Sequence, residues 1–90
     1  MEFEWGEDKR REVLAKHGID FTAAAAIFAG PVLTRIDGRR EYGETRQVSI
    51  GKVGDRFIVV VHTDRNGRKR LISAWEGGRF EREQYQARFS

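Results

Sequence analysis

Polar and apolar positions alternate at the start of the chain, and two helical stretches follow before a series of strand-like segments. Residues 1–5 alternate, which predicts a short strand with Phe3 and Trp5 on one face. The next two segments, 7–17 and 23–29, have the spacing and composition of short helices. The chain is therefore expected to begin with one strand and two helices.

The two predicted helices carry signals at their ends. Gly18 ends the first one, whose acidic first turn and basic last turn suit the helix dipole. Asp20 or Thr22 can cap the second helix. Gly30-Pro31 ends it, because proline cannot continue a helix.

The remainder of the chain is typical of a β-sheet followed by a helix. Further strands are predicted over 32–37, 44–53, 56–63 and 69–75, and a closing helix over 79–89. Residues 57–61 are apolar without alternation, which favours a central strand buried on both faces. Asn66-Gly67 is a strong hairpin signal. This order predicts an α+β fold: a small antiparallel β-sheet with the two N-terminal helices packed on one face and a C-terminal helix.

Composition indicates a single small domain over residues 1–90, with 39% hydrophobic and 34% charged residues. The absence of cysteine excludes disulfides and zinc–thiolate sites and is compatible with a cytoplasmic protein. No apolar run approaches the roughly 20 residues that span a bilayer, and the N-terminus is acidic rather than signal-like. We therefore expect a cytoplasmic protein without a membrane partner.

Basic residues are concentrated in the middle of the chain, although the net charge is only +3. Between positions 35 and 70, ten bases stand against five acids, which favours a polyanionic partner. Thirteen of the 17 basic residues are arginine, whose planar fork matches phosphate geometry. Two other readings remain: a genome of high GC content also enriches arginine, and C-terminal arginines can form surface ion pairs with Glu76, Glu81 and Glu83.

Several motifs follow one another along nearly the whole chain. They are Phe3-Glu4-Trp5, Asp8-Lys9-Arg10, Lys16-His17-Gly18-Ile19-Asp20-Phe21, Asp37-Gly38-Arg39, Tyr42-Gly43-Glu44-Thr45-Arg46, Arg70-Leu71-Ile72-Ser73-Ala74, and Glu83 with Tyr85. In this order and spacing they resemble the BrnT family of toxins from bacterial type II toxin–antitoxin systems. The resemblance implies a compact fold similar to the RelE group of ribonuclease toxins. It also implies toxicity through RNA cleavage that inhibits translation.

The resemblance implies partners as well. The substrate is expected to be RNA, namely mRNA, either free or bound to the ribosome. A cognate antitoxin with a ribbon-helix-helix DNA-binding part is expected to neutralise the toxin and to repress their shared operon. Operator DNA is then reached only through the antitoxin.

The chain departs from the family pattern at three positions. Trp75 stands where many relatives carry arginine, Gly77 where many carry alanine, and His62 where tyrosine is common. If the arginine of the relatives contacts the scissile phosphate, this chain lacks one charge there. Trp75 then either weakens the activity or stacks on a base instead.

An RNA-cleaving protein does not have to supply a nucleophile, because the 2′-hydroxyl of RNA is itself the nucleophile. A base near that hydroxyl, an acid near the leaving 5′-oxygen and positive charge around the phosphate suffice, without a metal or another cofactor. From the resemblance and the charge pattern we expect the catalytic residues to be Arg46, Arg70, Glu44, Glu83, Tyr85 and His17. We expect the residues that bind RNA to be Lys16, Arg39, Arg40, Lys69 and Trp75.

Within this set, Arg46 and Arg70 are the candidates for the positive charge, because each heads a predicted strand and both can reach one concave face. The candidates for base or acid are Glu44, Glu83, His17, His62 and Tyr85. A carboxylate beside several arginines stays ionised, which suits a proton acceptor better than a proton donor.

Each candidate also has a purely structural reading. Arg46 and Arg70 can form inter-strand ion pairs with Glu44 or Glu83. His17 can cap the C-terminus of a helix, His62 can be a core histidine, and the ring of Tyr85 can pack in the core or against a helix end. Trp75 can stack on a base, anchor the antitoxin or pack in the core.

Two functions stay open from the sequence. The first is a metal-independent endoribonuclease toxin. The second is a catalytically weak relative that acts mainly as an antitoxin-binding co-repressor. A plain basic nucleic-acid-binding domain without an antitoxin is the third and least specific reading.

Overall fold

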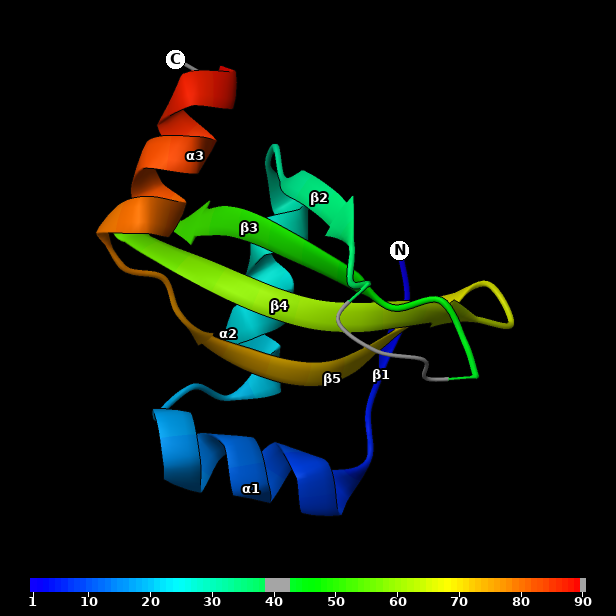
Figure 1. The fold of residues 1–90 in the computed structure, drawn as a ribbon. Helices are drawn as coiled ribbons and strands as arrows, with labels where there is room; N and C mark the ends of the chain where they lie inside the picture. The colour runs from blue at the N-terminus through cyan, green and yellow to red at the C-terminus, as the bar shows by residue number, and fades with distance from the viewer. Residues whose placement is uncertain (39–42, 90) are drawn as a thin grey trace.

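The structure, a computed structural model, describes residues 1–38 and 43–89 (Figure 1). Its elements follow the chain as β1 (Phe3–Glu4), α1 (Glu7–His17), α2 (Phe21–Ala25), the 3₁₀-helix η1 (Ala26–Ala29), β2 (Leu33–Ile36), β3 (Gln47–Val53), β4 (Arg56–Arg65), β5 (Arg68–Glu76) and α3 (Arg79–Phe89). No helix in the described part of the chain is both long and apolar enough to cross a lipid bilayer.

Within those described residues, five strands form one sheet in the order β1-β5-β4-β3-β2. Strands β2 to β5 pair antiparallel with their neighbours. Strand β1 pairs with β5 in parallel, with Phe3 opposite Lys69 and Glu4 opposite Arg70. The predicted α+β class is confirmed, including the two N-terminal helices on one face. The parallel pairing of the first strand was not predicted.

Several element boundaries differ from the prediction, and two of the differences have a visible cause. The second helix was expected over 23–29, but its first turn begins at Phe21, because the Asp20 side chain accepts a hydrogen bond from the backbone N–H of Thr22. Its last four residues tighten into η1. Strand β3 begins at Gln47 and not at position 44. The backbone before it has another partner, since the Thr63 hydroxyl donates to the Thr45 carbonyl.

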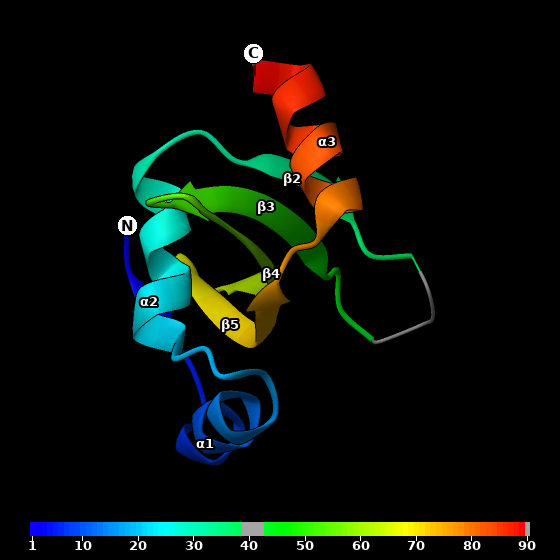
Figure 2. The ribbon, with the colours of Figure 1, turned by 90° about the vertical axis from the view of Figure 1, so that its left-hand side faces the viewer.

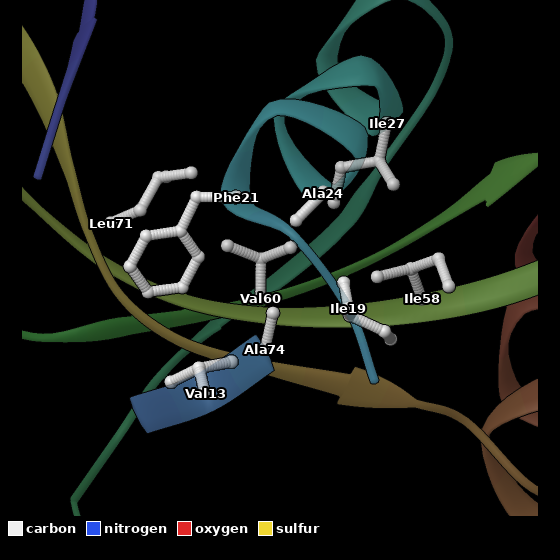
Figure 3. Packing of buried hydrophobic residues seen from close by; sticks show 9 residues of the cluster. All are labelled: Val13, Ile19, Phe21, Ala24, Ile27, Ile58, Val60, Leu71 and Ala74. Carbon is white, nitrogen blue, oxygen red and sulfur yellow. The ribbon is translucent and has the colours of Figure 1, made fainter. Parts of the chain in front are cut away.

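The main core lies between the sheet and the helices α1 and α2 (Figure 3). Its buried residues are Val13, Ile19, Phe21, Ala24 and Ile27 from the helical side, and Ile58, Val60, Leu71 and Ala74 from the sheet. A Cβ atom at Gly51 would lie 2.5 Å from the Cβ of Ile27. Glycine at this position therefore lets η1 lie directly on β3.

A second core covers the opposite face of the sheet near α3 (Figure 2). The Tyr85 ring packs edge-on against Phe57, with 5.5 Å between ring centroids. Its hydroxyl donates a hydrogen bond of 2.9 Å to the carbonyl of Pro31. One residue thus joins α3 to β4 and to the segment before β2.

Strand β4 is buried on both faces from Phe57 to Thr63, as the run of apolar residues predicted. Two residues of this range are polar, Thr63 and His62, and His62 is fully buried. Its Nε2 lies 2.7 Å from the Ser49 hydroxyl, and its ring packs edge-on against Phe28 at 5.2 Å. His62 therefore belongs to the α1/α2 core. Burial, aided by the nearby charge of Lys69, lowers the pKa of His62 to about 4.

The hairpin between β4 and β5 has the turn that Asn66-Gly67 predicted. Both residues have positive φ, 55° and 76°, as a type I′ turn requires. The register brings Arg65 opposite Arg68 and Thr63 opposite Arg70. A shift between Val61 and His62 leaves one extra residue on β5, so the turn and this bulge together set which side chains of β5 share a face.

The buried His62 predicts a specific loss of stability in acid. Its pKa is lower in the folded protein than in the unfolded chain, so the unfolded state binds the proton more tightly. The stabilisation is complete above about pH 6.5 and declines as the pH falls towards 4. Urea unfolding of the wild type and of His62→Gln at both ends of this range should show the wild type losing about 3 kcal/mol relative to the variant. Parallel pH profiles for the two proteins would contradict the assignment.

Candidate active site

A hollow of about 440 Å³ opens beside the β4–β5 hairpin. This hairpin lies at the end of the sheet away from α3 (Figure 1). The residues that line it are Gly6, Lys9, Glu44, Arg46, Thr63, Arg65, Arg70, Leu71 and Ile72. His62 points to the α1/α2 face, and side chains alternate along a strand, so Thr63 and Arg65 point to the other face. The hollow therefore lies on the same face of the sheet as α3, beyond the part that α3 covers.

Arg70 is held in this hollow by the first strand. In the parallel register of β1 and β5 it lies opposite Glu4, and its Nη1 donates a hydrogen bond of 2.8 Å to the Glu4 carboxylate. Both side chains are only a quarter to a third exposed, at 30% and 25%. A charge-assisted bond at this depth fixes the direction of the guanidinium more firmly than a surface pair would.

The segment before β3 supplies the opposite wall. The Thr63 hydroxyl donates to the Thr45 carbonyl over 2.6 Å, and the backbone N–H of Asp37 donates to the Arg46 carbonyl over 2.7 Å. The first bond holds the segment that carries Glu44 and Arg46 against the end of β4, and the second joins it to the residue that follows β2. Glu44 also lies 3.6 Å from a guanidinium nitrogen of Arg65.

Positive charge dominates the described lining of the hollow. The basic lining residues are Lys9, Arg46, Arg65 and Arg70, and the one carboxylate among the lining residues is that of Glu44. Such a setting attracts a phosphodiester and supplies N–H donors to its oxygens. The carboxylate adds a group that accepts a proton. Among the described residues, no cluster of three or more His, Cys, Asp or Glu side chains could hold a metal ion.

The hollow gathers part of the predicted catalytic set. Glu44 and Arg46, from the segment before β3, and Arg70, from β5, line it together. The ion-pair reading placed Arg70 against Glu44 or Glu83, whereas the structure pairs it with Glu4. Sequence reasoning had assigned Glu4 no role.

Two other catalytic candidates lie on α3, at the opposite end of the sheet. Glu83 pairs with Arg79 on the helix surface at 3.0 Å. Tyr85 is buried, with its hydroxyl bonded to the Pro31 carbonyl. The structure does not bring them to the hollow, and Tyr85 has the packing role that was its alternative reading.

The remaining candidates are dispersed. Lys16 and His17 are exposed at the end of α1, and the His17 ring lies 6.3 Å from that of Trp75, which is half-buried at the end of β5. Lys69 points to the α1/α2 face, where its Nζ lies 3.4 Å from Asp64 and 5.2 Å from the centre of the Phe28 ring. Arg39 and Arg40 lie outside the described residues.

Sequence reasoning missed Lys9 and Arg65, which also line the hollow. Arg65 had a usable signal: a two-residue turn at Asn66-Gly67 places it opposite position 68 and on the same face as Arg70. Lys9 had none, because its approach depends on how α1 packs along β5.

Comparison with known protein families finds one match. The model of the family described as "Ribonuclease toxin, BrnT, of type II toxin-antitoxin system" matches residues 5–81, which include every described residue that lines the hollow. A search of curated proteins found no match to the chain.

The distant position of Tyr85 predicts that its hydroxyl matters for stability and not for RNA cleavage. Tyr85→Phe removes the bond to the Pro31 carbonyl and should lower the free energy of unfolding by about 1 kcal/mol. The kcat/KM for RNA should stay at the wild-type value. A loss of cleavage with unchanged urea unfolding would place the Tyr85 hydroxyl in the reaction instead.

Proposed function

Since the chain belongs to the BrnT family of ribonuclease toxins from type II toxin–antitoxin systems, we propose that the hollow beside the β4–β5 hairpin is its RNA-cleaving site. The observation that carries the proposal is the set of cations from α1, β4, β5 and the segment before β3 around the carboxylate of Glu44. They supply the proton acceptor and the positive charge that cleavage by the RNA's own 2′-hydroxyl requires.

The reaction proceeds as an internal transfer at phosphorus. Glu44 accepts the proton of the 2′-hydroxyl, and the 2′-oxygen attacks the adjacent phosphorus. The bond from phosphorus to the 5′-oxygen breaks, that oxygen takes up a proton from water, and Glu44 returns its proton to the solvent. The products are a 2′,3′-cyclic phosphate and a 5′-hydroxyl end.

Arg46 and Arg70 bind the phosphoryl oxygens on which negative charge accumulates in the transition state. Their guanidinium groups present planar forks of N–H donors, and Glu4 fixes the one on Arg70 in advance. Lys9, on the α1 side of the hollow, is placed to stabilise the leaving 5′-oxygen.

Cleavage by this site needs no metal ion. The charge that a divalent cation would supply at the phosphate comes from the guanidinium groups, and the nucleophile belongs to the substrate. Activity should therefore persist in EDTA.

Variants of the hollow test the proposal. Arg46→Ala and Arg70→Ala should each lower kcat/KM at least about 100-fold, as loss of a transition-state donor does. Glu44→Gln keeps the shape but loses the base, with an expected decrease of about 100-fold or more. The measurement is cleavage of end-labelled RNA in EDTA by the purified chain freed of its antitoxin, with product ends identified by their cyclic phosphate.

The matched control is Arg79→Ala on α3, where the side chain is 91% exposed and pairs with Glu83. It should cleave like the wild type. Full activity in the Arg46 and Arg70 variants, with urea unfolding confirming that they are folded, would remove the hollow from the reaction.

The alternative function is a catalytically weak toxin that acts mainly as an antitoxin-binding co-repressor. The observation in its favour is that several cations of the hollow already have carboxylate partners, Arg70 with Glu4 and Arg65 with Glu44. Intact RNA after incubation with folded wild-type protein, together with normal complex formation with the antitoxin, would favour this function.

Membership in a type II system means that a protein antitoxin is the toxin's cognate partner. We propose that this antitoxin has a ribbon-helix-helix DNA-binding part and that the toxin contacts operator DNA only through it. The family resemblance supports this proposal.

We also propose that residues 1–90 act as one toxin domain in the cytoplasm, because β1 and α3 pack on the same sheet and the RNA substrate is cytoplasmic.

The antitoxin proposal predicts the behaviour of operator DNA in a gel-shift assay. The toxin alone should not shift an operator fragment at physiological salt, whereas the toxin–antitoxin complex should. The antitoxin alone serves as the control for direct DNA binding. A sequence-specific shift by the toxin alone would contradict the proposal.

A further inference from the structure

Three arginines lie in a compact group on one face of the β4–β5 hairpin. Arg65 and Arg68 lie directly opposite each other across the turn, and Thr63 lies opposite Arg70. Directly opposite residues share a face, and residues two apart on a strand share it too. Arg65, Arg68 and Arg70 therefore project together on the face of the hollow. We call these three residues the arginine row.

The arginine row is unfavourable for the fold itself. Like charges directly opposite on paired strands repel each other, and Arg65 and Arg68 are such a pair. The contacts that offset this repulsion are long: Arg65 is 3.6 Å from Glu44, and Arg68 is 3.7 Å from Glu2. Surface pairs at these distances contribute little stability, so the repulsion points to a function.

The N-terminal segment around β1 places carboxylates against the arginine row. Glu2 and Glu4 are two residues apart on one face of the β1 segment, and they contact Arg68 and Arg70 in turn. The two carboxylates thus occupy two successive anion positions along β5. The inner pair is short and half-buried, whereas the outer pair is long and exposed, with Glu2 74% exposed. An incoming anion displaces Glu2 far more easily than Glu4.

We propose that Arg68, with Arg65, forms a second phosphate subsite for the nucleotide next to the cleaved bond, and that the substrate is a single strand of RNA extended along the arginine row. This inference rests on the proposed cleavage site, where Arg70 and Arg46 hold the scissile phosphate. The flanking phosphate takes the position at Arg68 that Glu2 now occupies.

The spacing of the row supports an extended single strand. Positions two apart on a β-strand are separated by about 6.6 Å, which is comparable to the step between successive phosphates in an unstacked chain. A duplex presents its phosphates on a curved surface and meets a short row of this kind at fewer points.

The sharpest test compares substrates that differ by one phosphate. A dinucleoside monophosphate has only the scissile phosphate, and trinucleotides extended on the 5′ or the 3′ side add one flanking phosphate. In the wild type, one of the two extensions should raise kcat/KM about fivefold, the gain expected from one exposed charge pair. Arg68→Ala should lose that gain while cleaving the dinucleotide as the wild type does.

Arg56→Ala is the matched control. Arg56 lies on the same strand pair, its side chain is 55% exposed against 54% for Arg68, and each has one glutamate partner. This variant should keep the gain from the flanking phosphate. An equal loss on dinucleotide and trinucleotide in Arg68→Ala, or an equal loss of the gain in Arg56→Ala, would overturn the subsite.

A binding measurement separates this inference from the proposed cleavage. Anisotropy of a labelled RNA with a 2′-deoxy group at the cleavage position reports affinity without turnover. Removing one phosphate contact should reduce the slope of log K against log salt by about 0.7 in Arg68→Ala and not in Arg56→Ala. A reduced slope with an inactive wild type would refute the cleavage site and keep the subsite; an unchanged slope would refute the subsite.

Discussion

The structure depends on the burial of strand β4 on both of its faces. An apolar strand needs cover on both sides, and the chain supplies it from different elements: α1 and α2 on one face and α3 on the other. Helix α3 covers only the first part of β4, because it packs near Phe57 at the start of the strand. The opposite end of β4, where the sequence turns polar at Thr63, is therefore free to form a hollow. The position of the candidate site thus follows from the limited length of β4 that α3 covers.

The hollow holds guanidinium groups close together, and nearby carboxylates limit their repulsion. Guanidinium groups close together repel each other, and nearby carboxylates relieve that repulsion in the free protein. Residues 2–5, which include strand β1, provide Glu4 and Glu2 for this purpose, while Phe3 and Trp5 pack into the core on the other face. This short N-terminal segment thus orients Arg70 and occupies part of the proposed phosphate-binding surface. RNA has to compete with these carboxylates, and it does so most easily at the exposed outer pair.

Much of the fold was predictable because its signals are local. The buried run of β4, the turn at Asn66-Gly67 and the ends of α1 each depend on residues within a few positions. Arg46 and Arg70 were expected to reach one concave face because each heads a predicted strand, whereas the sequence did not separate Glu44 from Glu83 as the base. The parallel pairing of β1 was not predictable, since no turn links it to β5 and the register depends on the packing of Phe3 and Trp5. For the same reason the sequence did not reveal Glu4 as the partner of Arg70, or Lys9 as part of the hollow. Tyr85 and Glu83 carried suitable chemistry, but the direction in which α3 leaves the sheet takes them to its other end.

The most direct test of the account is a structure of the protein with a short RNA that carries a 2′-deoxy group at the cleavage position. The account predicts the phosphate of that position between the guanidinium groups of Arg46 and Arg70, with the 2′-carbon of the preceding sugar facing Glu44. An RNA bound instead along α3, or beside Trp75 and His17 with the hollow left empty, would contradict it.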